Sequence, residues 1–171
     1  MSGFGACPEV LCVASEPLFD LSSIDLDQVA ISAEEVGRLN PQCGAMRQLD
    51  HVIWLDNDSG RALGVKHITE GEFWVPLHIP GRPLMPGVLM IEAAAQLCSV
   101  FFLKHRTDQP RFLGFTRCDE AIFRGQVIPG ESLYLLSEEV EVRPRRFVSR
   151  TQGIVDGKLV FEAKITGMVL Q

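Results

Sequence analysis

Alternating apolar and polar residues dominate the chain after residue 111, with the period of two that half-buried strands show. Asp156-Gly157, between two such runs, predicts a tight hairpin, and Pro129-Gly130 marks another turn. We therefore predict about five antiparallel strands in this part of the chain. The strand-like runs cover residues 112–115, 121–128, 132–142, 146–155 and 158–170.

The first part of the chain predicts a short helix and two or three further strands. Ser32 and Glu35 fit a capping box, so a helix is expected over residues 33–39, before Pro41. Four prolines favour a stiff loop over residues 76–86. The expected strands cover residues 49–55, 62–68 and 72–77.

One long helix is predicted between these two groups of strands. Residues 88–103 are nearly all apolar, and Pro86 is suited to the first position of a helix that ends near residues 104–106. The run is shorter than the roughly 20 residues of a membrane span and contains Glu92 and Gln96, so we interpret it as a buried helix. It is apolar almost all round, and a single sheet would leave one side exposed. A second subunit or sheet is expected there.

The order of the elements predicts an α+β fold, in which an antiparallel sheet wraps around one long central helix. The length of 171 residues suits one domain. We divide the chain into an acidic, irregular N-terminal extension, residues 1–30, and a folded domain, residues 31–171.

The net charge of −6 comes from the N-terminal segment. Residues 1–37 hold seven of the 22 acidic residues and no Lys or Arg, so the remaining 134 residues carry 16 basic residues against 15 acidic ones. This balance argues against a general nucleic-acid-binding protein. The five cysteines include no C-x-x-C pair, and the N-terminus lacks the basic region of a secretory signal, which predicts a reduced, cytoplasmic protein.

The few polar side chains of the long helix form one stripe. Glu92, Gln96 and Ser99 are spaced by four and three residues, so they share one face. Burial favours the neutral form of a carboxyl group, which suits Glu92 to act as a general acid. The alternative is a structural glutamate that is hydrogen-bonded to the backbone or to Gln96, while Gln96 either assists Glu92 or satisfies a buried backbone group.

His78 lies at the start of the proline-rich loop, 14 residues before Glu92. Histidine is the side chain best suited to act as a general base at neutral pH, although a single loop histidine can also be incidental. No H-x-x-H or H-x-x-x-H motif and no cysteine pair lies nearby, so no metal site is predicted.

The start of the long helix offers a third chemical group. The backbone amides of Gly87 and Val88 lie at the positive end of the helix, and Gly87 has no side chain to obstruct a ligand. Such amides bind anions or polarise carbonyl groups. A base, an acid and a carbonyl-polarising group together suggest proton abstraction next to a carbonyl, with protonation of a leaving group on the β-carbon.

The segment from His78 to Gln96, HIPGRPLMPGVLMIEAAAQ, closely resembles the active-site segment of the 3-hydroxyacyl-acyl-carrier-protein dehydratases of type II fatty acid synthesis. These enzymes have the hotdog fold. The resemblance covers about residues 31–170 and includes Phe123-Arg124 and the stretch from Val127 to Glu131.

The resemblance implies specific roles and an oligomer. His78 would take the α-proton, Glu92 would protonate or orient the departing 3-hydroxyl group, and the Gly87 amide would polarise the thioester carbonyl. In this family the histidine of one subunit meets the acid of the other across a homodimer, and trimers of dimers are common. Glutamate at position 92 favours the simple dehydratase over the group that also isomerises its product. The reaction needs no cofactor.

The expected partner is acyl carrier protein, which is acidic and presents its substrate on a phosphopantetheine arm. Four arginines could dock it by electrostatic steering. Alternatively, they form a solvated face that balances the glutamates nearby. The four are Arg143, Arg145, Arg146 and Arg150.

Two other functions fit the same fold. A hotdog acyl thioesterase would place a water molecule for attack on the thioester. A non-catalytic protein would bind acyl chains or carrier protein without turnover, but the presence of both His78 and Glu92 argues against it.

Overall fold

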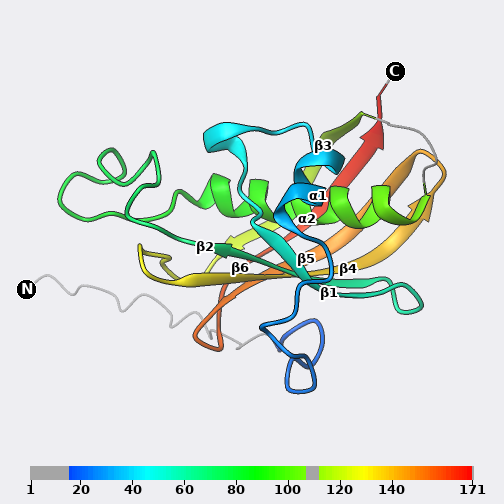
Figure 1. The fold of residues 1–171 in the computed structure, drawn as a ribbon, viewed down its shortest axis with the longest axis horizontal. Helices are drawn as coiled ribbons and strands as arrows, with labels where there is room; N and C mark the ends of the chain where they lie inside the picture. Colours follow the sequence, from blue (N-terminus) through cyan, green and yellow to red (C-terminus); the bar gives the residue numbers. More distant parts are fainter. Residues whose placement is uncertain (1–15, 107–111, 171) are drawn as a thin grey trace, which may run out of the picture.

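The computed structural model describes residues 16–106 and 112–170. Six strands form one antiparallel sheet in the order β1–β2–β4–β5–β6–β3, and the long helix α2 lies across one face of it (Figure 1). The elements are α1 (Ala33–Leu39), a 3-10 turn (Gly44–Met46), β1 (His51–Asp56), β2 (Arg61–His67), α2 (Gly87–Arg106), β3 (Leu113–Phe123), β4 (Ser132–Arg143), β5 (Arg146–Val155) and β6 (Lys158–Val169).

Helix α2 is the centre of the main hydrophobic core. Its apolar side chains, Phe102 among them, pack against the inner face of the sheet, and α1 lies beside it. By length and composition residues 87–104 could cross a membrane, but 61% of that window is buried inside the protein, as in the core helix of a folded domain. The predicted α+β hotdog arrangement, a sheet around one helix, is confirmed.

Several local predictions are also confirmed. Helix α1 has the predicted bounds, and the Ser32 hydroxyl accepts a hydrogen bond from the Glu35 amide at 3.3 Å. The second half of the expected capping box is replaced, because the Glu35 carboxylate pairs with Lys104 of α2. Asp156 and Gly157 both have positive φ angles, 48° and 72°, as the tight turn between β5 and β6 requires.

Two strand predictions are wrong. Residues 72–77 form successive turns, in which the Val75 amide donates to the Glu72 carbonyl and the His78 amide to the Trp74 carbonyl, at 3.0 and 2.7 Å. The runs predicted at residues 112–115 and 121–128 contribute to one strand, β3, which ends at Phe123, so residues 124–128 lie outside any strand. The pairing of β3 with β6 shifts register twice. These irregularities disturb the alternation and make one strand resemble two.

The outer face of the sheet carries a second, smaller core. Residues 16–30 contain no helix or strand and lie on the side of the sheet opposite α2 (Figure 1). Phe19 is 8% exposed, and the centroid of its ring lies 5.6 Å from that of Trp54. The Arg61 guanidinium lies over the Phe19 ring, also 5.6 Å from its centroid. The Gln152 side chain accepts from the Leu18 amide at 2.8 Å. Residues 16–30 thus pack on the sheet of the folded domain. The domain boundary at residue 31 stays a prediction.

Replacing Phe19 with alanine is expected to destabilise the protein by about 3 kcal/mol, because it removes the centre of the outer core and leaves a cavity over the sheet. Chemical denaturation measures the loss. Leu26→Ala is the control, since Leu26 is 40% exposed, and its effect should stay within about 0.5 kcal/mol. A loss for Phe19→Ala within about 0.5 kcal/mol would contradict the packing role of Phe19.

Candidate active site

The segment between β2 and α2 forms a loop that extends past the first turn of α2 (Figure 1). His78 lies in this loop and is exposed. Its ring Nδ1 lies 2.8 Å from the Leu84 carbonyl oxygen, and the Leu84 amide donates back to the His78 carbonyl, also at 2.8 Å. A carbonyl oxygen can only accept, so Nδ1 carries the proton in the neutral ring. Nε2 is then the unprotonated nitrogen, which is the form a general base requires.

The hollow beside His78 has a volume of about 330 Å³ and is mostly apolar. Its wall includes the start of α2, where the Gly87 and Val88 amides lie in the first helical turn, whose amides have no acceptor within the helix. The space above Gly87 is occupied, because a Cβ atom there would lie 2.7 Å from the Phe123 ring. Glycine at position 87 is therefore required by the close contact with Phe123, and the role of its backbone amide toward a ligand stays a prediction.

Glu92 is half-buried and is held by two amide side chains. Its Oε1 atom accepts from Gln96 Nε2 at 2.8 Å and from Gln42 Nε2 at 3.1 Å. Gln42 follows α1, and sequence reasoning missed it. The pair of donors fixes the direction of the carboxylate and leaves further lone pairs for a substrate hydroxyl group.

Gln96 is 1% exposed and makes more bonds than the sequence predicts. Its Oε1 accepts from the backbone amides of Gln48 and Leu49, at 2.9 and 3.1 Å, and its Nε2 donates to the Met46 carbonyl at 2.7 Å as well as to Glu92. Both alternatives weighed for Gln96 thus apply together. It satisfies buried backbone groups and also orients Glu92.

His78 and Glu92 lie in different hollows of the chain. His78 faces the 330 Å³ hollow at the start of α2, whereas Glu92 lines a crevice of about 40 Å³ between α2 and the sheet. Neither residue contributes to the lining of the other's hollow. One subunit, over the residues that the structure describes, does not assemble an acid and a base around a common point.

A buried lysine anchors the loop that carries His78. Lys66 Nζ, on β2, lies 2.8 Å from Glu72 of the turn segment and 3.4 Å from Asp50. Burial of a lysine is tolerated only with such partners. Sequence reasoning missed this cluster, although a lysine at position 66 within the otherwise apolar run of β2 was the available signal.

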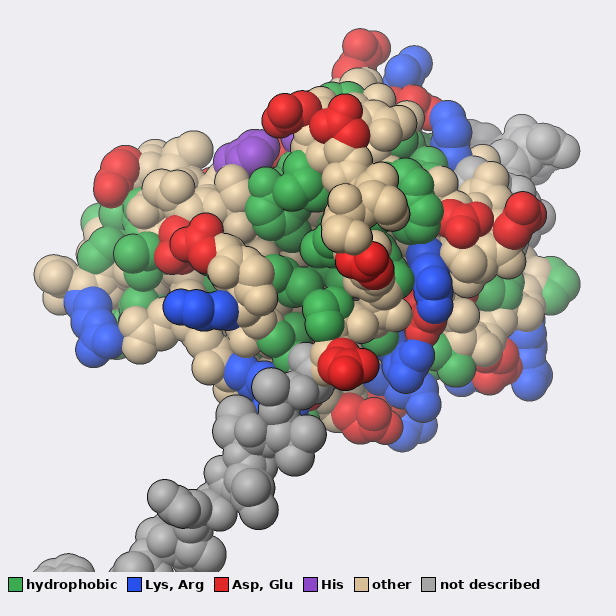
Figure 2. Space-filling view, turned by 90° about the horizontal axis from the view of Figure 1, so that it is seen from below, with side chains coloured by type: hydrophobic (Ala, Val, Ile, Leu, Met, Phe, Trp, Pro, Cys, Tyr) green, Lys and Arg blue, Asp and Glu red, His purple; other side chains and the backbone are tan. Residues whose placement is uncertain are grey.

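Three of the four arginines suggested for carrier-protein docking form ion pairs with glutamates. Arg143 and Arg146 lie 2.6 and 3.4 Å from Glu141, and Arg150 pairs with Glu138. Arg145 donates to the Val169 carbonyl at 3.4 Å. This arrangement fits the alternative of a balanced, solvated face, and Figure 2 shows basic and acidic side chains lying beside each other. The docking role stays a prediction.

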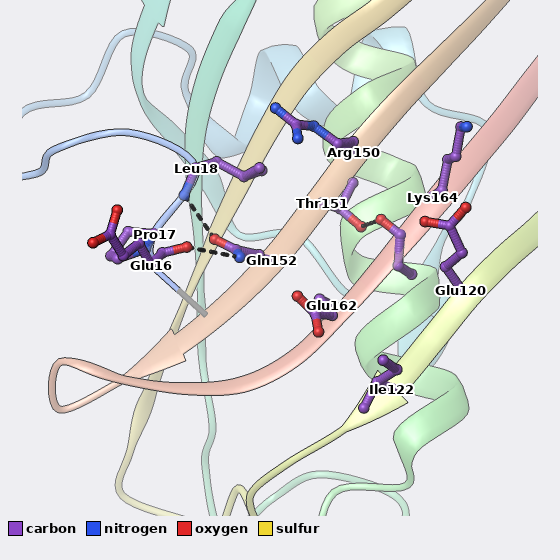
Figure 3. Close-up of a pocket in the computed structure, with 11 residues that line it drawn as sticks. Glu16, Pro17, Leu18, Glu120, Ile122, Arg150, Thr151, Gln152, Glu162 and Lys164 are labelled. Atoms are coloured by element: carbon purple, nitrogen blue, oxygen red, sulfur yellow. Dashed lines mark hydrogen bonds between the residues drawn. The ribbon is translucent and has the colours of Figure 1, made fainter. Parts of the chain in front are cut away.

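A hollow of about 420 Å³ lies on the outer face of the sheet, away from α2. Residues 16–18 form one side of it and β3 the other, and Figure 3 shows α2 behind the strands. Gln152 spans part of this hollow by bonding the Leu18 amide and the Glu16 carbonyl. The sheet therefore separates this hollow from both His78 and Glu92.

A family model described as "FabA-like domain" matches residues 40–164. The chain belongs to the FabA-like family. Two relatives are named 3-hydroxyacyl-acyl-carrier-protein dehydratase FabZ. The one from Clostridium acetobutylicum is 36% identical over 145 residues, covering 83% of this chain and all of the relative. The one from Agrobacterium fabrum is 33% identical over 136 residues, covering 80% and 88%.

Solved structures share the fold at low sequence identity. The dehydratase heterocomplex ApeI:P from Xenorhabdus doucetiae has a TM-score of 0.69 and 14% identity, covering 80% of this chain and 91% of that one. A hypothetical thioesterase with coenzyme A from Streptococcus pneumoniae has a TM-score of 0.54 and 10% identity, covering 70% and 84%. These likenesses support the hotdog fold of the family and do not separate its chemistries.

Replacing Gln96 with leucine is expected to destabilise the protein by about 3 kcal/mol, because the buried amides of Gln48 and Leu49 and the carbonyl of Met46 lose their partner. Gln42→Leu is the matched control, since it removes one side-chain hydrogen bond to Glu92, and a loss of about 1 kcal/mol or less is expected. Denaturant unfolding of both variants measures the difference. Similar losses would contradict the structural role of Gln96.

Stability should also depend on Glu138 in a pH-dependent way. Burial alone raises the pKa of Glu138, but hydrogen bonds and charge from Arg150 and Arg61 outweigh it and lower the pKa below its usual 4.5. The ion pair therefore stabilises the folded state above about pH 4.5, and this contribution is lost as the pH falls through the lowered pKa.

Glu138→Gln should cost about 1 kcal/mol at pH 7, and the difference from wild type should vanish in acid. Unfolding free energies measured from pH 7 down to pH 3 test this. Glu70→Gln, at an exposed position, is the control and should show no such trend. A difference that persists unchanged at pH 3 would exclude the ion pair as its cause.

Proposed function

We propose that this protein dehydrates (3R)-3-hydroxyacyl thioesters of acyl carrier protein to trans-2-enoyl thioesters in fatty acid or related lipid synthesis, in the cytoplasm. The similarity to the FabZ dehydratases, which extends over 80% or more of the chain, carries this proposal. The geometry supports it, since His78 has a free ring nitrogen and Glu92 is held in a fixed direction.

In the proposed reaction, His78 Nε2 removes the proton from the α-carbon. The Gly87 amide, at the positive end of α2, stabilises the negative charge that develops on the thioester oxygen. The electron pair of the broken C–H bond forms the double bond between the α- and β-carbons. Glu92 gives its proton to the departing 3-hydroxyl group, which leaves as water. After the reaction His78 carries an extra proton and Glu92 lacks one. Net transfer of one proton from His78 to Glu92 restores the starting state of the enzyme.

The proposed active site is formed by two subunits, with His78 from one and Glu92 from the other. The separation of these residues into different hollows supports this arrangement. Strand β3 is at the edge of the sheet, and apolar side chains remain exposed around the His78 loop and along β3, which a partner subunit would cover. They include Leu77, Ile79, Val88, Phe115 and Phe123. A homodimer is the minimal assembly, and a trimer of dimers is its proposed larger form.

His78→Ala and Glu92→Gln are each expected to lower the rate of crotonyl-thioester hydration by about 10²–10⁴-fold, because each removes one proton-transfer group. Loss of absorbance by the enoyl thioester measures the rate. Full activity in both variants would exclude the assigned roles. Release of free thiol, measured in parallel, would instead indicate a thioesterase.

Co-expression of the two variants tests whether the site is shared. Random pairing makes half of the dimers mixed, and each mixed dimer has one intact site of two, so about a quarter of wild-type activity should return. Two differently tagged copies of His78→Ala, co-expressed in the same way, are the control and should show no recovery. No recovery in the mixed sample would mean that His78 and Glu92 do not act across two subunits.

A further inference from the structure

The crevice beside Glu92 has the lining of a site for an alkyl chain. On α2 it is bordered by Glu92, Ala95 and Ser99, and on the other side by residues of the sheet and of the segment after α1. Beyond Glu92, Gln42 and Ser99, the side chains that line it are carbon only. They are Pro41, Ala95, Leu113, Phe115, Phe147 and Ile165.

The three helical residues give the crevice a direction and a length. Glu92, Ala95 and Ser99 follow one another on one side of α2, and the seven helical steps from the first to the last span about 10 Å. The next residue of this stripe, Phe102, does not line the crevice. Its ring lies 5.4 Å from that of Phe147, tilted by 40°. The crevice therefore begins at the carboxylate and ends at these two rings.

Phe147 is held firmly at this closed end. It is 3% exposed and stands directly opposite Gly167 on the neighbouring strand β6. A Cβ atom at Gly167 would lie 2.3 Å from the Phe147 ring, so the ring lies flat over the glycine. With Phe102 on one side and Gly167 on the other, the ring cannot swing aside to deepen the crevice without displacing a packed neighbour.

We propose that Phe147 sets the acyl-chain length of the substrate by closing the far end of this crevice, and that the protein acts on short and medium 3-hydroxyacyl chains. This inference rests on the proposed function, since it places the β-carbon of the substrate at Glu92. The tail then runs along α2 past Ala95 and Ser99 and stops at Phe147. The span of about 10 Å along α2 therefore limits the length of the tail.

The test is the dependence of kcat/KM on chain length. Enoyl thioesters of four to sixteen carbons are hydrated by wild type, Phe147→Ala and the milder Phe147→Leu, each first checked for folding by circular dichroism. For wild type, kcat/KM should fall by at least about tenfold once the tail exceeds the crevice. Both Phe147 variants should move this fall to longer chains.

Two further variants make the test directional. Ser99→Leu fills the crevice before its end, so the fall should move to shorter chains. Phe161→Leu is the matched control, because Phe161 is a buried phenylalanine of β6 that does not line the crevice, and its profile should equal that of wild type.

The outcomes separate this inference from the proposed function. If wild type hydrates the thioesters but folded Phe147→Leu keeps the wild-type length profile, Phe147 does not set the length and the proposed function stands. If wild type hydrates no thioester of any length, the proposed function itself is wrong.

Discussion

The buried side chain of Gln96 connects the three parts on which the site depends. It belongs to α2, it satisfies the backbone of residues 46–49 just before the sheet begins, and it donates to Glu92. An apolar helix inside a sheet offers few ways to fix a carboxylate, because every polar group brought there needs a partner. One amide with two donors and an acceptor meets this requirement. The acid is therefore positioned by the same bonds that attach the helix to the segment preceding β1.

His78, the proposed base, is positioned by a different set of contacts. His78 lies in an exposed loop whose conformation depends on backbone hydrogen bonds, on the buried ring of Trp74 and on the ion pair between Lys66 and Glu72. The loop is thus tied to β2, while His78, the proposed base, remains exposed. A rigid acid on a helix and an anchored base on a loop can meet only if the two elements come from surfaces that face each other. In a homodimer each subunit can supply one of them to its partner.

Much of the fold follows from periodicity. The bounds of α1, the long helix and the turn at Asp156-Gly157 could all be predicted from local patterns, because capping, apolar spacing and turn chemistry are local properties. Strand β3 could not, because its bulges depend on how it pairs with β6, a contact distant in sequence.

For the candidate site too, local sequence patterns predicted some residues, and contacts between residues distant in sequence determined the others. Sequence reasoning selected His78, Glu92 and Gln96 from residue type and spacing, but not the residues that hold them. Gln42 and Lys66 gain their importance from contacts across the fold, and the real neighbour of Gly87 is Phe123, 36 positions later. Likewise, whether the arginine cluster was free or paired depended on strand register, which places Glu138 opposite Arg150.

The packing of Phe19 on the outer face has a consequence for the composition of the sheet. Strand β2 is buried at five successive positions, because α2 covers one of its faces and residues 16–30 cover the other. Such a strand has lost the alternation that keeps an open antiparallel sheet soluble. The region matched by the family model begins only at residue 40, so a fragment cut there would retain the proposed catalytic residues and expose the apolar side chains that residues 16–30 cover. The stretch that carries the proposed site and the stretch that covers both faces of the sheet are thus different lengths of chain.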